Sequence, residues 1–475
     1  MYRPVVLLAI ILTNFVASGT AAEPNEFVRL AAQISPDQLM TTVRDLARFE
    51  GRQSGTSGGE ATSSYVTSRL PETTLQPFML KTIQIDTPLH VKIQTEGHST
   101  PLQNGQDFIP VMNAASAELI SAPVVFVGYG IEASSQGLDE YAGLSVSGKV
   151  VLFLRGQPKG FTGRITHADK VNTARAKGAV AYLTVTGPIL SPYEQRRGMT
   201  SDPMMLYEGM GAGVLQGLWL APAIAETILR PTGRTLRSFQ ESLDIALAAR
   251  SVETGANITI EIKRRRFDAS ASNVLAWWTG SDPELRKETI VLGAHHDHFG
   301  IQGGLVFPGA DDNASGTAAI LEIARVLSAT GIRPKRSILF VSFAGEEQGL
   351  LGSQFYVSHP LRPLSTVKAM VNIDHAGVGN GNITVGLSRL EKAVAQTAAE
   401  KIGLGGRLDL FGLFPGGDHV PFAEAGIPTA TIVTSGPHPD FHRPTDRPEK
   451  IDPELLAVVT RYALSLVWSL ANENF

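Results

Sequence analysis

The chain has 475 residues, 43% of them hydrophobic and 18% charged, which is ample for a large buried core and normal for a soluble globular protein. Its formal net charge of −4 gives no basic excess that would indicate binding to nucleic acid or to an anionic membrane surface. It contains no cysteine, which excludes disulfides and a cysteine nucleophile, so any metal must be held by His, Asp or Glu.

The first 22 residues have the pattern of an export signal. An early arginine precedes an apolar stretch too short to span a bilayer comfortably, and a small-residue segment ends in Ala21 and Ala22. This order predicts a signal peptide over residues 1–22, cleaved near Ala22, and a secreted or periplasmic protein; an uncleaved N-terminal anchor is the alternative. No membrane span is expected after cleavage, because the apolar C-terminal segment carries Arg461 and has the pattern of a packed amphipathic helix.

Two patterns of predicted secondary structure follow the expected signal peptide. Residues 23–115 begin with two helical stretches around a Gly/Ser-rich loop, in SPDQLMTTVRDLARFEGRQSGTSGGEATSSYVTSRL. From about Ser121 the pattern changes to short strands, APVVFVGYGI, GKVVLFLRG and AVAYLTVTG, with a helical HADKVNTARAKGA between the last two. We therefore predict a small β-rich domain over residues 116–262. The basic run KRRR at 263–266 is expected to be a solvated strand face.

From Asn273 onward, apolar strands alternate with helices. The strands are NVLAWW, ETIVLGAH, RSILFVSFAG, VKAMVNI and TATIVTS, and the helices include SGTAAILEIARVLSATG and the C-terminal segment. Continuous Val/Ile/Leu strands separated by helices imply a mostly parallel central sheet sandwiched by helices. We predict one α/β domain that is begun by residues 23–115, interrupted by the β-rich insertion, and completed by residues 263–475.

Acidic and histidine residues gather where these strands end. His295, Asp374 and the pair Glu346 and Glu347 each follow a strand, PHPDFHRPTD follows TATIVTSG, and GADDNASG opens a helix. Ligands in an open α/β sheet lie just past the carboxyl ends of its strands. So many carboxylates at one rim would repel one another unless cations bind there. Two divalent ions bridged by a carboxylate need about five N and O ligands, which suits zinc.

The adjacent glutamates suggest a division of labour. One binds metal, and its neighbour takes the proton from a water molecule that the ions have acidified. The expected reaction is hydrolysis of a carbonyl compound.

Five motifs occur in an order that resembles a known family. GAHHDHFG, GADDNASG, GEEQG, NIDHAG and DFHRPTD are similar to the motifs of the zinc-dependent exopeptidase family that includes bacterial aminopeptidases and glutamate carboxypeptidase. The resemblance covers roughly Asn273 to the C-terminus and the N-terminal helices. The insertion resembles a protease-associated (PA) domain through LDEYAGLSVSGKVVLFLRG and KVNTARAKGAVAYL.

The resemblance implies a di-zinc aminopeptidase fold, peptide substrates and a role for each motif residue. Five side chains would hold two zinc ions per chain: His295 with Asp374, Glu347 with His442, and Asp312 as the bridge. Glu346 would be the general base and later the acid that protonates the leaving amine. Asp297 would orient the imidazole of His295.

The other histidines and Asp311 have simpler expected roles. His296 should point away from its neighbours in an extended segment, and His298 should be a hydrogen-bonded wall residue rather than a ligand. Asp311 is expected either to cap the helix that follows it or to favour the dipole of that helix. His375 and His438 are expected to be structural or rim residues.

One position departs from the family pattern. Many members have a tyrosine directly before the last ligand histidine, where its hydroxyl stabilises the oxyanion, but this chain has Phe441 there. We hypothesise that zinc, helped by His419 in the GGDHVPF loop, takes over this role.

The leading functional prediction is a secreted metallo-aminopeptidase. A carboxypeptidase of the same family is the nearest alternative and would need basic side chains to clamp a terminal carboxylate. A mono-zinc glutaminyl-cyclase-like acyltransferase and a non-catalytic receptor-like protein on the same fold are further alternatives. The presence of Glu346 and of all five ligand positions disfavours the last two. The sequence leaves the side-chain specificity, the role of the insertion and the oligomeric state open.

Overall fold

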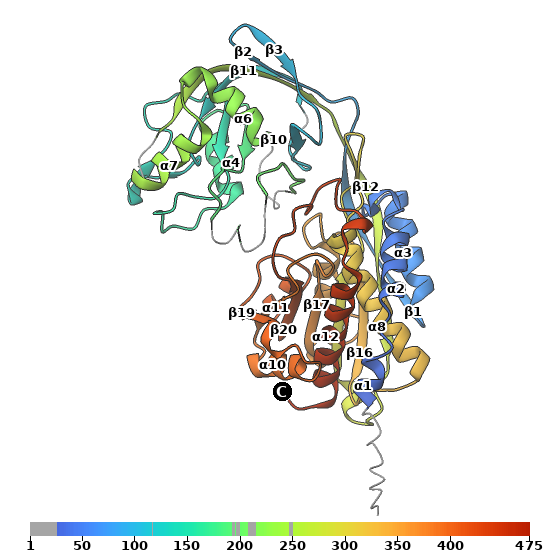
Figure 1. Cartoon of the computed structure of the whole chain (residues 1–475). Coiled ribbons are helices and arrows are strands. Elements are labelled where there is room, and N and C mark those ends of the chain that lie inside the picture. Colours follow the sequence, from blue (N-terminus) through green and yellow to red (C-terminus); the bar gives the residue numbers. More distant parts are fainter. Residues whose placement is uncertain (1–25, 116, 192–194, 196–199, 208–214, 247–249) are drawn as a thin grey trace, which may run out of the picture.

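The computed structural model describes residues 26–475 except 116, 192–194, 196–199, 208–214 and 247–249 (Figure 1). The expected signal peptide therefore lies outside the described residues. The described chain forms two lobes, each built on an eight-stranded sheet. We name residues 26–85 and 264–475 the main lobe and residues 90–262 the second lobe.

The sheet of the main lobe confirms the predicted α/β class. Its strands are, in spatial order, β1 (Thr73–Ile85), β12 (Arg264–Trp278), β16 (Ser337–Phe343), β13 (Thr289–His295), β17 (Val367–Ile373), β20 (Thr429–Thr434), β18 (Ile383–Ser388) and β19 (Leu408–Phe411). The four central strands, from β16 to β20, are mutually parallel. β1, β12 and β18 run antiparallel to their inner neighbours, so the sheet is parallel at its centre and mixed overall.

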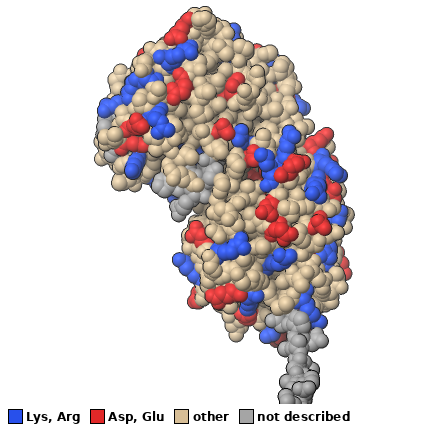
Figure 2. Space-filling view, in the orientation of Figure 1, with Lys and Arg blue, Asp and Glu red and all other residues tan. Residues whose placement is uncertain are grey.

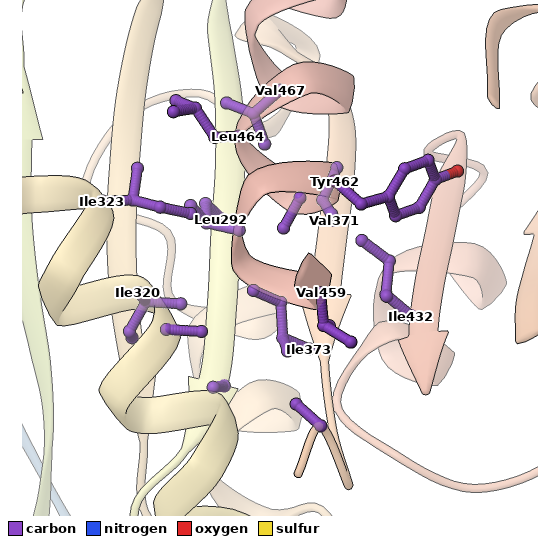
Figure 3. Packing of buried hydrophobic residues seen from close by; sticks show 14 of the residues in the cluster. Leu292, Ile320, Ile323, Val371, Ile373, Ile432, Val459, Tyr462, Leu464 and Val467 are labelled. Atoms are coloured by element: carbon purple, nitrogen blue, oxygen red, sulfur yellow. The ribbon is translucent and has the colours of Figure 1, made fainter. Parts of the chain in front are cut away.

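Helices cover both faces of this sheet, because its strands are apolar on both sides. On one face lie α1 (Glu26–Ala31), α2 (Pro36–Leu46), α3 (Ser57–Arg69), α8 (Gly316–Thr330), α10 (Lys392–Glu400) and α12 (Pro453–Asn472). Figure 3 shows Leu292 of β13 packed between Ile323 of α8 and the residues of α12. The alternate residue Val291 belongs to the core of the opposite face, which α9 (Leu351–Ser358) and α11 (His419–Glu424) cover.

α12 is the helix that the C-terminal pattern predicted. Within the described residues it alone has the length and apolar composition of a membrane span, and 83% of its apolar window is buried by the rest of the protein. Tyr462 and Val467 pack against the central strands (Figure 3). The helix is a core element of the main lobe.

The second lobe begins earlier in the chain than expected. Its sheet has the order β3 (His98–Pro101), β2 (His90–Thr95), β11 (Val252–Ile262), β5 (Ala117–Phe126), β8 (Val150–Leu154), β9 (Ala181–Val185), β10 (Gln216–Leu220) and β4 (Phe108–Pro110). β2 pairs with β11 and β4 pairs with β10, so residues 90–110 belong to this sheet. The expected boundary at residue 116 therefore falls inside the lobe, which is not small. Its helices are α4 (His167–Ala176), α6 (Pro222–Leu229) and α7 (Leu236–Ala246).

The basic run 263–266 marks the return of the chain to the main lobe, and part of it is buried. Arg264 is 7% exposed, and its guanidinium donates to the backbone carbonyls of Val111, Met112 and Ala115 at 2.7–3.1 Å. Burial lowers the pKa of Arg264 to about 9. The expectation of a solvated strand face was wrong at this residue, because alternation does not reveal carbonyl groups of a distant loop, here residues 111–115.

The charged side chains form no single-sign region on the face drawn in Figure 2. Lys and Arg are interspersed with Asp and Glu over both lobes. This mixed surface agrees with the small net charge of −4.

Candidate metal centre

The acidic and histidine residues predicted as ligands come together at one edge of the main sheet. His295 ends β13, Glu346 and Glu347 follow β16, and Asp374 follows β17. These three strands are adjacent and parallel, so their carboxyl ends bring the side chains into one place. Two further segments complete the cluster: the short π-helix η5 (Ala310–Ser315), which leads into α8, carries Asp312, and the loop that follows β20 carries His442.

Asp312 lies at the centre of the cluster. Its Oδ1 is 3.3 Å from His295 Nε2, and its Oδ2 is 3.0 Å from His442 Nε2. Burial alone would raise the pKa of Asp312, but His375, His295 and His442 hold it well below its usual range. The two carboxylate oxygens thus face two different histidines, as a bridging ligand requires.

The two sides of Asp312 have matching carboxylates. On one side His295 Nε2 is 3.4 Å from Asp374 Oδ1. On the other side His442 Nε2 is 3.4 Å from Glu347 Oε2. The potential ligand atoms of His295, Asp312 and Asp374 all lie within 4.8 Å of one another. The geometry therefore brings all five predicted ligands together in two pairs around one bridge.

Glu346 lies between these pairs. Its potential ligand atom is within 4.8 Å of those of His295 and Glu347. Burial raises the pKa of Glu346 well above its usual range, and the nearby charges of Asp418 and Asp374 raise it further. Such a carboxyl group holds a proton more readily than an exposed glutamate does, which suits proton transfer.

The side chains of this cluster fit divalent cations. Burial raises the pKa of Glu347 as well, and the carboxylates of Asp312 and Glu346 add to the effect. His295 Nε2 and His298 Nε2 are buried and make no hydrogen bond within the described residues, although carboxylates surround them. Closely spaced carboxylates and imidazole nitrogens without hydrogen-bond partners are the donor set that zinc binds.

Asp297 supports the cluster, but in a different way from the expected one. His295 Nδ1 donates to the backbone carbonyl of Asp297 at 3.2 Å, while the carboxylate of Asp297 is 3.8 Å from that nitrogen. The carboxylate instead accepts the backbone N–H of Glu346 at 3.1 Å. Asp297 thus orients the ligand through its carbonyl and anchors the β16 loop through its side chain.

Two buried charged residues that the sequence reasoning missed hold the ligand loops from behind. Asp446 accepts the backbone N–H groups of Asp311 and Asp312 at 2.9–3.1 Å. Arg52 is fully buried and donates to the carbonyls of His296, Pro308 and Gly309. Asp446 belongs to the DFHRPTD motif, which could have identified it. Arg52 lies in a loop more than 240 residues away, and no local pattern singles it out.

His296 and His298, which follow His295, differ in direction. His296 points away from the cluster to Ser63 Oγ and Ser342 Oγ, and burial lowers its pKa to about 3. His298 points into the cluster, where its Nδ1 is 2.5 Å from Glu347 Oε1. The potential ligand atoms of His298, Asp312 and Glu347 also lie within 4.8 Å of one another, so His298 lies among the predicted ligands and not only at the wall.

Asp311 and His438 form a pair beside the cluster. The carboxylate of Asp311 accepts the backbone N–H of Gly377 at 2.8 Å and lies 2.7 Å from His438 Nδ1. The cap of α8 is instead Ser315, which makes no side-chain cap bond, so Asp311 does not cap α8, and its expected effect on the helix dipole stays a prediction.

His375 lies closer to the predicted ligands than expected. Its Nε2 is 3.4 Å from Asp312 Oδ2 and 3.4 Å from Asp374 Oδ1. Phe441 packs edge-on against its ring at 4.9 Å. His375 is therefore more than a rim residue, because it contacts two of the predicted ligands. The NIDHAG motif contains His375 directly after Asp374, although it was expected to be a structural or rim residue.

His419, the expected oxyanion helper, begins α11 and is buried. Its Nε2 lies 2.9 Å from the backbone carbonyl of Phe414, and its Nδ1 has no partner within the described residues. No ion pair joins it to the five predicted ligands in the described part of the chain.

A cavity of about 820 Å³ adjoins the cluster. His375 and Phe441 line it together with apolar residues such as Phe411 and Val433. Gln195 and Met204 of the second lobe also line it, so both lobes contribute to the cavity. Its contact with His375 connects it directly with the cluster.

Gly309→Ala is expected to disturb the cluster. Gly309 has φ +56°, and an added Cβ would lie 2.2 Å from the backbone oxygen of Asp312 and 2.5 Å from the ring of His298. We expect lower zinc affinity and a loss of about 1–3 kcal/mol in the free energy of unfolding. Zinc titration and thermal unfolding measure both effects.

Gly331→Ala is the matched control for this substitution. Gly331 has a similar φ of +66° at the end of α8, but nothing lies within 4 Å of an added Cβ. If Gly331→Ala weakens zinc binding as much as Gly309→Ala does, the steric explanation is incorrect.

Known proteins resemble this chain both in sequence and in fold. A model of peptidase family M28 matches residues 273–467. Aminopeptidase YwaD of Bacillus subtilis (strain 168) is 27% identical over 479 residues, which cover 95% of this chain and 90% of that protein. The solved aminopeptidase from Aneurinibacillus sp. strain AM-1 superposes with a TM-score of 0.66 at 21% identity, over 94% of this chain and 97% of that one. BSAP, a zinc aminopeptidase from Bacillus subtilis, gives 0.64 at 22% identity, over 92% and 96%.

Proposed function

Because residues 273–467 belong to peptidase family M28, we propose that the protein is a zinc aminopeptidase that removes N-terminal residues from peptides. The observation that carries this proposal is the position of Asp312, whose two carboxylate oxygens face His295 and His442. The name of YwaD, which matches both lobes, supports an aminopeptidase.

In this proposal the cluster holds two zinc ions. His295 and Asp374 would hold one, Glu347 and His442 would hold the other, and Asp312 would be shared between them. When bound, zinc acidifies a water molecule and polarises the carbonyl of the scissile peptide bond.

Glu346 transfers the proton in the proposed reaction. It accepts the proton of the attacking water and later delivers it to the leaving amine. Its raised pKa, caused by burial and by the neighbouring carboxylates, supports both halves of this transfer. Phe441 has no hydrogen to donate to the oxyanion. His375 Nε2 lies 3.4 Å from Asp312 Oδ2, whereas His419 Nε2 lies against the carbonyl of Phe414. His375 is therefore nearer to the ligand cluster than His419.

The cavity would receive the N-terminal side chain of the substrate. Its apolar walls, which include Phe411, Phe414 and Val433, favour apolar side chains. A carboxypeptidase would instead need a cationic clamp. Arg407 is the one lysine or arginine among the described residues that line the cavity, and its guanidinium donates to the carbonyl of Gly381. The aminopeptidase is therefore the better proposal.

The proposed aminopeptidase would be an exported protein. The sequence of residues 1–22 supports a cleaved signal peptide, and the absence of cysteine is compatible with a secreted protein that relies on its core. The second lobe would be the PA-like domain.

Turnover of a peptide panel tests the function. We expect release of N-terminal residues from aminoacyl substrates, also when the C-terminus is blocked, and loss of this activity with a chelator. Restoration by zinc would follow because the ligand set is intact. Substrates with a blocked N-terminus are the matched control. Activity on these alone, dependent on a free C-terminus, would show a carboxypeptidase instead.

A further inference from the structure

One segment of the second lobe touches a predicted zinc ligand directly. We name residues 202–206 the strap. Met205 N donates to the backbone carbonyl of His442 at 2.8 Å, and His442 Nδ1 donates to the carbonyl of Met205 at 3.1 Å. One backbone bond and one side-chain bond thus join the two residues in both directions, although 237 positions separate them in the chain.

The hydrogen bond on Nδ1 determines which nitrogen of His442 can bind metal. A backbone carbonyl only accepts, so Nδ1 must carry the proton. The other nitrogen, Nε2, is then left with a lone pair, and it faces Asp312 and Glu347 at 3.0 and 3.4 Å. An acceptor on the second nitrogen is the usual means of orienting a metal-binding histidine. Here that acceptor comes from the other lobe.

Two side chains that precede Met205 anchor the strap beside this hydrogen bond. Met204 is buried with Trp219 of β10, and Phe441 packs against the same cluster. The ring of Phe441 in turn stacks on His442 at 3.7 Å. Asp202 forms an ion pair with Arg443 at 3.1 Å. An apolar column thus runs from the sheet of the second lobe to the imidazole.

The strap also borders the cavity, since Met204 lines it. The same contact therefore shapes the place where substrate would enter and the position of one metal ligand. Movement of the second lobe away from the main lobe would lose both together.

We propose that the strap holds His442 in the tautomer and orientation that bind the second zinc. Docking of the second lobe onto the main lobe and binding of that zinc are therefore coupled. The proposal rests on the zinc assignment proposed above. The strap acts through His442 and is a positioning element. By thermodynamic reciprocity, binding of the second zinc must then stabilise the docked strap by the same free energy by which the docked strap favours zinc binding.

Zinc titration of variants tests the coupling. Met204→Gly/Met205→Gly removes the anchoring side chains and keeps the backbone groups. We expect it to weaken the second zinc by about 10- to 100-fold, as loss of an outer partner of a ligand does. The first zinc, at His295 and Asp374, should be bound as in the wild type.

A charge exchange keeps the proposal testable if that double variant does not fold. Asp202→Arg should weaken the second zinc about fivefold, since the pair is partly exposed. Adding Arg443→Asp should restore affinity towards the wild type. Glu253→Arg breaks an ion pair with Lys149 inside the second lobe and is the control expected to change nothing.

Hydrogen exchange gives a readout independent of turnover. Zinc should slow exchange of the Met205 amide in the wild type and much less in Asp202→Arg. If every strap variant binds two zinc ions with wild-type affinity, or if zinc leaves the Met205 amide unprotected, the coupling is refuted. If the wild type binds no zinc at all, the proposed function fails and not the strap alone.

Discussion

Replacing Glu346 with glutamine should lower kcat by about 10²- to 10⁴-fold and leave both zinc ions bound. An amide of the same shape cannot accept the proton of the attacking water. The substitution breaks no side-chain hydrogen bond within the described residues, and the backbone N–H of Glu346 can still donate to Asp297. The loss should therefore be chemical and not structural. Steady-state kinetics and metal analysis on the same preparation measure it.

The adjacent Glu347 provides the matched control. Its carboxylate lies 2.5 Å from His298 Nδ1 and 3.4 Å from His442 Nε2, so Glu347→Gln should lose zinc as well as activity. The two variants differ by one position and carry the same chemical change. Substantial turnover by Glu346→Gln with two zinc ions bound would rule out its role as the base. Loss of zinc from Glu346→Gln would show that it is a ligand.

The clustering of the predicted ligands could be derived from the sequence because these residues follow a topological rule, whereas their binding of metal stays a prediction. His295, Glu347 and Asp374 each come directly after an apolar strand, and parallel neighbouring strands bring those ends together. The alternation of apolar and polar segments was enough to recognise the strands. The family resemblance, confirmed by the M28 match, then added Asp312 and His442 from loops.

The supports of the ligands could not be predicted in the same way. Arg52 reaches the carbonyls of the ligand loops across a separation of 244–257 positions, and Met205 reaches His442 across 237. These contacts involve backbone carbonyl groups, which every residue has, so no residue type marks the acceptor. The same limit explains the error about Arg264, whose buried guanidinium binds carbonyls of a distant segment.

The boundary of the second lobe was misplaced for a related reason. Residues 90–110 form strands at both edges of the second sheet, and β11 and β10, which pair with β2 and β4, lie more than 100 residues later. Pairing across that distance leaves no local pattern. The PA-like character of the lobe stays a prediction, since its motifs were read from the sequence alone.

Asp312→Asn should remove the bridge and with it most zinc binding and activity. We expect kcat/KM to fall by more than about 100-fold, because loss of an outer partner of a ligand alone costs about 10- to 100-fold. The amide keeps the size of the side chain, and the backbone N–H can still donate to Asp446. What disappears is the negative charge that faces His295 and His442 from two sides.

Asp311→Asn separates this bridging role from a general effect of charge. Asp311 directly precedes Asp312 in the chain. Its carboxylate nevertheless accepts the backbone N–H of Gly377 and lies against His438 Nδ1. Its variant should therefore keep two zinc ions. Unfolding gives a second measurement, since free zinc at 100 times its Kd should stabilise the wild type by about 2.7 kcal/mol. Asp311→Asn should show nearly the same gain and Asp312→Asn almost none. Equal gains in the two variants would contradict the assignment of Asp312 as the bridge.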